Sequence, residues 1–466
     1  MKKTKIICSI GPSCDNWGTF KKMVINGMNV ARINFSHSNI ENRKKIESLV
    51  KRARTELNHN IAILYDIKGP DLRTCEFFND KIQLVSGKSI VITEDDVIGT
   101  NEKICFNYKN IINKLSIGSR ILLDDGFYEL IVTQKKDKEV VCEIQNSGII
   151  KGRRGVCIPG VRLDVPFISK EDLEDIKYAC ISDGDFLALS FVNSRSDIKK
   201  VRELCKIFGK PNMSIVSKVE TQNAINNIEE IVEESDYIMV ARGDLGVEAG
   251  IENLPLNQKI LIDACHKHSK GIIMATQMMN SMIDNIRPTN AEVNDVANAV
   301  LSGCDAIMTS AETTIGKYPV ETVKQMTIIC EKCEQMTKYN LEDYKLLGTD
   351  IHNTIAKLAV NATLYLPIKA IVVSTTTGKT ALDMASLRPN AFIVATVTDE
   401  NVSRILSLKW GVYTSVTKIS NKTDEIVEIG IEVAKKILNL KKGDLVAIIG
   451  SSPFSAHTNF LKIEKI

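Results

Sequence analysis

The sequence predicts an α/β protein: a (β/α)8 TIM barrel with an inserted all-β lid domain and a C-terminal α/β open-sheet domain. Eight short apolar runs alternate with amphipathic segments, a β-rich stretch interrupts the third repeat, and a new strand–helix pattern follows the eighth. The 466 residues favour about three domains. We place the barrel in residues 1–70 and 167–342, the lid in 71–166 and the C-terminal domain in 343–466.

The eight apolar runs are short, end at turn or polar residues, and are mostly separated by segments with a helical period. This alternation is typical of parallel βαβ units, and eight such units favour a closed barrel. The runs are 5–12, 29–37, 61–70, 186–191, 214–220, 237–244, 271–277 and 306–312.

The interruption after the third run contains about 95 residues without a clear helix. Its apolar stretches at 81–93, 119–134 and 138–148 are punctuated by Gly, Asp and Asn, which is typical of an all-β module. Inserted after strand three, such a module can cover the site as a lid. Beyond the barrel, a helix at 351–366 is followed by strands separated by helices, as in an open α/β sheet.

Composition excludes several classes of protein. The net charge is +3, from 60 basic and 57 acidic residues, so nothing favours a nucleic-acid or membrane partner. Twelve cysteines are scattered, and the one close pair, Cys330 and Cys333, lacks a second pair for zinc and fits one helical turn. The N-terminal apolar stretch is too short for a signal peptide. We expect a cytoplasmic protein with reduced thiols.

Polar side chains gather where the predicted strands end, which is where barrel enzymes build their sites from the following loops. A solvated rim would also be polar, but it would not place small, specific groups at nearly every strand end. These residues are Arg32, Asn34, Ser36, Asp66, Lys68, Ser190, Lys218, Glu220, Arg242, Asp244, Thr276, Ser310 and Glu312.

Glu220 and Asp244 end adjacent strands, so their carboxylates can converge on one hard cation such as Mg²⁺ or Mn²⁺. Arg32 and Lys218 add two cations to the same ring, which suits a phosphorylated substrate. The alternative for any one pair is a buried salt bridge.

A second group of oxygens lies on strands two and three. Asn34, Ser36 and Asp66 offer one carboxylate and neutral oxygens, which suits a monovalent cation. A structural hydrogen-bond network is the open alternative.

Several motifs occur in a fixed order: "KIICSIGPS", "GMNVARINFSH", "DIKGPDLRT", "SKVE", "VARGDLGVE", "ATQMMNSM", "RPTNAEVNDVANAV" and "SAETTIGKYP". In this combination the chain resembles the pyruvate kinase family over nearly its whole length. The resemblance implies transfer of a phosphoryl group between phosphoenolpyruvate and ADP, giving pyruvate and ATP in glycolysis.

The resemblance implies roles for the matching residues. Arg32 would bind the transferring phosphate, and Lys218 would neutralise it and stabilise the enolate. Glu220 and Asp244 would bind Mg²⁺ or Mn²⁺. The amides of Gly243 and Asp244 would hold the substrate carboxylate at a helix N-terminus.

Further roles follow from the same resemblance. Thr276 would bind substrate near the face where the enolate is protonated, and Ser310 and Glu312 resemble a proton relay, with Ala311 in place of the usual Gly. The implied K⁺ ligands are Asn34, Ser36, Asp66 and the Ile67 carbonyl. The implied nucleotide contacts are Asn34, His37, Arg73 and Arg154.

The chain departs from the family pattern at several positions. Ile67 replaces a common Thr, which leaves a backbone carbonyl ligand intact. Asp71 stands where K⁺-dependent members carry Glu and independent ones often carry Lys. An acid cannot supply the cation of that Lys, so we predict K⁺ dependence. Arg154 replaces Lys, which leaves phosphate binding feasible with a different geometry.

Other departures concern assembly and the site margin. The resemblance implies a homotetramer, in which Asn280 and Asn290 replace a Glu and an Arg at buried subunit contacts, so these contacts can differ. Cys157 replaces a common Asn, and Asn193 a common Arg.

The segment "VVSTTTGKTA" follows a strand and opens a helix, and it resembles the family's loop for a sugar-phosphate activator. The alternative is a capped helix start. The late "GSSPFSAHTN" lacks the glycines usual in the effector loop, so the effector stays open. The effector residues expected are Thr375, Thr376, Thr377, Gly378, Lys379 and Thr380.

Two rival functions remain at this stage. Another barrel enzyme acting on phosphoenolpyruvate would share the metal carboxylates but lack the lid and the C-terminal domain. A non-catalytic, metabolite-sensing paralogue would fit the substitutions, although Arg32, Lys218, Glu220, Asp244 and Thr276 are intact.

Overall fold

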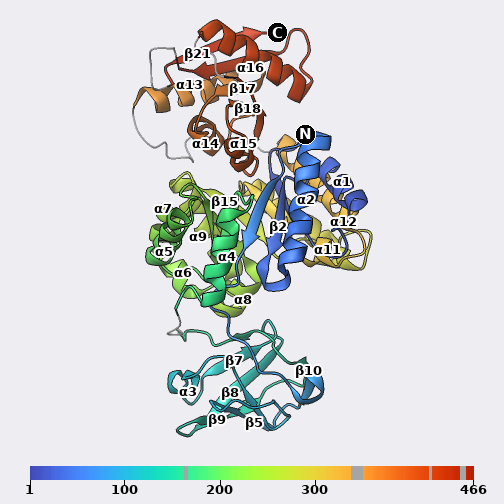
Figure 1. Cartoon of the computed structure of the whole chain (residues 1–466), viewed down its shortest axis with the longest axis vertical. Coiled ribbons are helices and arrows are strands. Elements are labelled where there is room, and N and C mark those ends of the chain that lie inside the picture. The colour runs from blue at the N-terminus through green and yellow to red at the C-terminus, as the bar shows by residue number, and fades with distance from the viewer. Residues whose placement is uncertain (162–165, 337–349, 419–421, 452–457) are drawn as a thin grey trace.

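The computed structural model describes residues 1–161, 166–336, 350–418, 422–451 and 458–466. Three domains follow one another along the long axis, with the barrel in the middle, the lid at one end and the C-terminal domain at the other (Figure 1). The predicted boundary at 342/343 lies outside the described residues. The predicted fold class is confirmed.

The barrel is closed by eight parallel strands, and each of the eight predicted runs contains one of them. Their order around the barrel is sequential, with β1 paired to β16. The strands are β1 (Lys5–Ser9), β2 (Val30–Asn34), β3 (Ala62–Asp66), β12 (Phe186–Leu189), β13 (Ser214–Val219), β14 (Tyr237–Ala241), β15 (Gly271–Ala275) and β16 (Ala306–Thr309).

Helices surround the barrel, and side-chain caps define where several begin. Ser169 and Thr289 form capping boxes with the third residue of their helices, which satisfies otherwise unpaired backbone N–H groups. The helices are α1 (Trp17–Ile25), α2 (Ile40–Leu57), α4 (Lys170–Ile181), α5 (Arg195–Ile207), α6 (Gln222–Asn226), α7 (Ile228–Glu234), α8 (Arg242–Ala249), α9 (Leu254–Lys267), α10 (Asn290–Leu301), α11 (Ala311–Thr314) and α12 (Pro319–Met336), with 3₁₀ turns η1 (Phe35–His37), η3 (Ile251–Asn253) and η4 (Asn280–Ile283).

The barrel has two apolar cores because alternate residues of a strand face opposite sides. One core lies between strands and helices and includes Ile6, Ile63 and Ile215. The other fills the barrel interior, where Leu64 and Met239 pack with Leu408 of the C-terminal domain. The interior is therefore filled, and chemistry is confined to the mouth.

The lid connects to the mouth through the carboxyl end of β3. Its main sheet has the order β11-β7-β8-β9-β5-β6, with a separate β10-β4 pair. A one-turn helix, α3 (Ile111–Lys114), interrupts the predicted all-β pattern, and η2 (Phe78–Asp80) precedes β4. The strands are β4 (Lys81–Leu84), β5 (Ser89–Thr93), β6 (Lys103–Cys105), β7 (Arg120–Leu123), β8 (Tyr128–Lys135), β9 (Glu139–Ile144), β10 (Gly148–Lys151) and β11 (Val156–Cys157).

The C-terminal domain is an open sheet of order β19-β18-β17-β20-β21, in which only β21 is antiparallel among the described strands. The sequence interpretation identified the three central strands but not the two edge strands, β19 and β21. The elements are α13 (Ile351–Tyr365), β17 (Ile368–Ser374), α14 (Lys379–Ser386), β18 (Phe392–Val397), α15 (Glu400–Leu406), β19 (Val412–Val416), α16 (Thr423–Leu438), β20 (Leu445–Gly450) and β21 (Phe460–Lys465).

A buried ionic cluster joins the barrel to this domain at the end opposite the lid. Asp305, just before β16, lies 3.1 Å from Arg388 and 3.2 Å from Lys409 and accepts the backbone N–H of Trp410 and Ile272. Burial disfavours the Asp305 carboxylate, but the two cations lower its pKa to about 2. The cluster therefore fixes the C-terminal domain to the base of the barrel.

All twelve cysteines are free thiols, and Cys330 and Cys333 lie on α12, as predicted. Across the described ranges, no helix is both long and apolar enough to cross a membrane.

Candidate active site

Four charged side chains form a continuous chain across the mouth of the barrel. Arg32 donates from Nε to Asp66 Oδ2 at 2.7 Å, and Lys218 Nζ lies 3.4 Å from Asp66 Oδ1. Lys218 Nζ also lies 3.0 Å from Glu220 Oε1. Arg32, Asp66 and Glu220 are buried, and only 13% of the Lys218 side chain is exposed. The opposite charges therefore hold one another in place with little contact with solvent.

Two serines complete this chain. Ser9 Oγ accepts from Arg32 Nη1 at 2.7 Å, and Ser190 Oγ accepts from Lys218 Nζ at 2.7 Å. The sequence interpretation noted Ser190 only as a strand-end residue and did not single out Ser9. Its position at the end of β1 is the signal that identifies it.

The surrounding charges favour the charged forms of Lys218 and Asp66. Burial disfavours the Lys218 ammonium, but Asp66 and Glu220 together raise its pKa above the ordinary value. Burial also disfavours the Asp66 carboxylate, and here Lys218 and Arg32 lower its pKa. These contacts favour the ammonium form of Lys218, which can attract an incoming anion.

Glu220 lies near enough to Asp244 for the Asp244 charge to affect its pKa. Burial raises the pKa of Glu220 to about 7; Lys218 opposes this shift, and the charge of Asp244 adds to it. Glu220 is buried and Asp244 exposed at the start of α8. Two carboxylates in mutual repulsion, with one side open to water and substrate, fit a divalent cation with oxygen ligands. Among the described residues, no three or more His, Cys, Asp or Glu gather as a metal site.

The ends of β14 and β15 are joined at the site. The Gly243 amide donates to Thr276 Oγ1 at 2.9 Å, and Arg242 donates to the Thr276 carbonyl at 2.6 Å. Thr276 has φ 67°, a left-handed conformation that is strained for a β-branched residue. The strain is held by these contacts and fixes the Thr276 hydroxyl beside the N-terminus of α8.

Glu312 and Ser310 lie at the end of β16, and Glu312 braces two loops. Its buried carboxylate accepts the backbone N–H of Met279 at 3.1 Å and of Ser310 at 2.6 Å. These contacts join the loops after β15 and β16, so the geometry gives Glu312 a positioning contact in addition to any part in proton relay.

Two of the four residues expected at a K⁺ site, Asn34 and Asp66, are register partners on β2 and β3. Ser36 lies on η1 directly after β2, and Ile67 directly follows β3. Asn34 Oδ1 accepts the Ser36 N–H at 3.0 Å, and the Ile67 carbonyl accepts from Ser190 Oγ at 2.8 Å. Asp66 is held by Arg32 and Lys218. Asn34 Oδ1, the Ile67 carbonyl and the Asp66 carboxylate therefore each have a protein partner.

The expected nucleotide residues lie between the barrel and the lid. Burial, and then the charges of Arg73 and Arg32, lower the pKa of His37, which places these three side chains near one another. Arg73 pairs with Asp71 at 2.5 Å, and Arg154 is exposed at 3.6 Å from Asp124. His37 and Arg154 are exposed, and the two guanidiniums, each beside an aspartate, are groups that can bind phosphate oxygens.

The lid reaches α8 directly. The Cys157 thiol of the lid hydrogen-bonds the Glu248 carboxyl, and Asp125 is near enough to Asp244 for its pKa to be raised, first by burial and then by that charge. The lid therefore contacts α8, as its insertion point predicts.

The expected effector segment lies in the C-terminal domain, remote from the mouth (Figure 1). Gly378 donates to Thr375 Oγ1 at 3.0 Å, and Thr380 Oγ lies 3.4 Å from Thr458 Oγ1. Gly378 has φ 82° and begins α14. The late segment "GSSPFSAHTN" lies mostly outside the described residues. Asn280 and Asn290 are exposed on the barrel.

Comparison with known proteins agrees with this layout. Models of the pyruvate kinase barrel domain and the pyruvate kinase alpha/beta domain match residues 1–323 and 353–464. The chain is 40% identical to a pyruvate kinase of Geobacillus stearothermophilus over 472 residues, covering all of this chain and 80% of that protein.

Two further relatives extend the comparison. A pyruvate kinase of Staphylococcus aureus is 41% identical over 476 residues, covering all of this chain and 81% of that protein. The crystal structure of a pyruvate kinase from Cryptosporidium parvum superposes with a TM-score of 0.93 at 32% identity, covering all of this chain and 96% of that one. The chain therefore belongs to the pyruvate kinase family of phosphotransferases, which convert phosphoenolpyruvate and ADP into pyruvate and ATP.

Proposed function

We propose that the barrel mouth carries out this transfer with Lys218 and Arg32 on the phosphate. The P–O bond to the enol oxygen breaks, and a new P–O bond forms to a terminal oxygen of ADP. The enolate left behind accepts a proton at its terminal carbon to give pyruvate. The observation that supports this assignment is the chain of contacts from Arg32 through Asp66 and Lys218 to Glu220.

Each protein group has a distinct task in this proposal. Arg32 offers a planar fork to phosphate oxygens, and Lys218 offers a point charge that stabilises phosphate and then enolate. The amides at the start of α8 bind the substrate carboxylate. Thr276, held in its strained conformation, orients the face of the enolate that is protonated, with Ser310 and Glu312 behind it.

Two cations fit the donor sets, and the family typically uses both Mg²⁺ and K⁺. Glu220 and Asp244 would hold Mg²⁺ or Mn²⁺, which neutralises negative charge shared by phosphate and carboxylate. Asn34, Ser36, Asp66 and the Ile67 carbonyl would hold K⁺, with His37, Arg73 and Arg154 taking the nucleotide. The lid, through Cys157 and Glu248, would close over both.

The other proposals concern regulation and assembly. The threonine-rich start of α14 would bind a sugar-phosphate activator, with Lys379 exposed as its cation. The protein would form a homotetramer with subunit contacts altered at Asn280 and Asn290. A cytoplasmic location fits twelve free thiols. The rival enzyme class does not fit, because both domains of the pyruvate kinase family are matched.

Phosphoenolpyruvate saturation in an assay coupled to lactate dehydrogenase tests the reaction and the K⁺ prediction together. Activity is expected with Mg²⁺ and K⁺, and replacement of K⁺ by tetramethylammonium at equal ionic strength is expected to remove most of it, because that cation is too large for the oxygens around Asp66. Equal activity in both salts would contradict K⁺ dependence. No pyruvate under any condition would contradict the reaction. The same series with sugar phosphates tests the activator.

A further inference from the structure

The turn that carries two expected ligand residues is held by one arginine. Directly after β2, η1 presents Ser36 and His37. Arg43 of α2 donates from Nε to the Ser38 carbonyl at 3.2 Å and from Nη2 to the Phe35 carbonyl at 3.5 Å. Its guanidinium carbon also lies 3.5 Å from the centre of the Phe35 ring. Arg43 therefore contacts both ends of the turn.

A second helix fixes the arginine from the other side. Arg43 Nη1 lies 2.7 Å from Asp175 Oδ1 of α4, and only 9% and 11% of these side chains are exposed. At the start of the same helix, Asp172 accepts the Gly69 N–H at 3.0 Å. Gly69 follows β3 where the chain leaves for the lid. The ion pair therefore connects the turn to the helix that anchors the lid connection.

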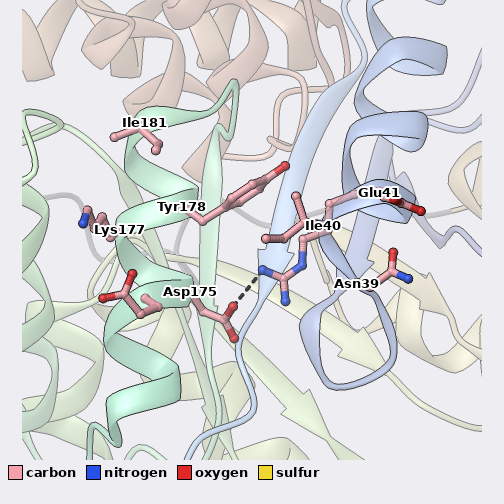
Figure 2. Close-up of a pocket in the computed structure, with 9 residues that line it drawn as sticks. Asn39, Ile40, Glu41, Asp175, Lys177, Tyr178 and Ile181 are labelled. Carbon is pink, nitrogen blue, oxygen red and sulfur yellow. Dashed lines mark hydrogen bonds and ion pairs between the residues drawn. The ribbon is translucent and has the colours of Figure 1, made fainter.

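Figure 2 shows the pair crossing a groove between α2 and α4. The groove has a volume of about 810 Å³. Residues at the start of α2, including Ile40, and residues of α4, including Tyr178 and Ile181, line it. Because the groove separates the helices here, the ion pair bridges a gap that apolar packing does not fill. Because a guanidinium is planar and its hydrogen bonds to a carboxylate are directional, the pair fixes the position of Arg43 relative to α4.

Aromatic packing also holds the η1 turn, through Phe35. The Phe35 and Tyr65 ring centres are 5.0 Å apart, and Tyr178 meets both rings edge-on. Glu47 accepts from the hydroxyls of Tyr65 and Tyr178 at 2.6 and 2.9 Å. The turn thus rests on a rigid base, and Arg43 sets its orientation on that base.

We propose that Arg43, oriented by Asp175, is a positioning residue that sets Ser36 and His37 for the monovalent cation and the nucleotide. This rests on the proposed roles of Ser36 and His37. Arg43 touches neither substrate, and its effect passes through the backbone of η1.

The test compares Arg43→Gln, Arg43→Lys and Asp175→Asn in the coupled assay. Arg43→Gln is expected to raise the KM for ADP and the K⁺ concentration for half-activation by about tenfold, with kcat at saturation within about twofold and the KM for phosphoenolpyruvate little changed. Arg43→Lys keeps the charge but loses the planar guanidinium. It is expected to raise the KM for ADP and the K⁺ concentration for half-activation by less than Arg43→Gln does, and the same is expected of Asp175→Asn.

Arg52→Gln is the matched control. Arg52 lies on the same helix and pairs with Glu56 at 2.6 Å, but it is half-exposed and far from η1 in sequence. It is expected to leave both constants unchanged. If Arg43→Gln shifts only the melting temperature, or lowers kcat alone, the proposal is wrong. If Arg43→Gln does not fold, unchanged constants in Arg43→Lys and Asp175→Asn overturn it. An unchanged KM for ADP in His37→Ala would instead contradict the nucleotide assignment.

Discussion

Replacing Lys218 with methionine is expected to lower kcat by about 10³-fold or more. Its ammonium lies between Asp66 and Glu220 and is the group best placed to neutralise the phosphate as it moves and the enolate that remains. Methionine keeps most of the side-chain volume but has no charge. Initial rates in the coupled assay, with saturating phosphoenolpyruvate, ADP, Mg²⁺ and K⁺, give the loss directly.

Lys270→Met is the matched control for this variant. Lys270 lies just before β15, at the opposite end of the barrel, and donates to the Ser235 carbonyl at 2.6 Å. It is expected to retain kcat within about twofold, since it is remote from the mouth. Both variants should retain the far-ultraviolet circular dichroism of the parent protein. Near-normal turnover in Lys218→Met would remove the mechanism.

Replacing Glu220 with glutamine is expected to weaken Mn²⁺ binding by on the order of 10²-fold, with a parallel fall in activity at fixed metal. The amide oxygen can still accept the Phe191 N–H, which Glu220 accepts at 2.6 Å, so the loop after β12 should stay in place. What is lost is one of the two negative charges facing the metal. Titration followed by electron paramagnetic resonance of free Mn²⁺ measures this without turnover.

A buried glutamate away from the site controls for the change of charge. Glu47→Gln removes a carboxylate of α2 that accepts the hydroxyls of Tyr65 on β3 and Tyr178 on α4. It is expected to leave Mn²⁺ affinity unchanged. Equal Mn²⁺ affinity in Glu220→Gln and the parent protein would mean that the ion is held elsewhere.

The barrel was predictable because buried parallel strands read as short apolar runs, and all eight appear in the structure. The edge strands β19 and β21 were not predictable, because an edge strand is partly exposed to solvent and its sequence is not a continuous apolar run. In β21, "FLKIEK" contains only exposed and partly exposed residues and has no continuous apolar run. Likewise, α3 is a single turn of four residues, too short to show a helical period.

The sequence predicted which residues lie at the strand ends, but it did not predict which charged side chains contact each other. Periodicity places Lys218 and Glu220 at one mouth, but only the folded chain shows that Lys218 bridges Asp66 and Glu220. Ser9 shares a strand-end position with the other site residues, but its hydrogen bond to Arg32 is visible only in the folded chain. The ion pair of Arg43 is made with Asp175 of α4, which is over 100 residues away along the chain. No local sequence pattern therefore reveals this contact.

A crystal structure of the protein with Mn²⁺ and phosphoenolpyruvate tests the central claim most directly. The account predicts one anomalous peak about 2.1 Å from both the Glu220 and Asp244 carboxylates, with the substrate phosphate in contact with Lys218 Nζ and the Arg32 guanidinium. A peak away from these two carboxylates, or a phosphate that neither cation reaches, would contradict it.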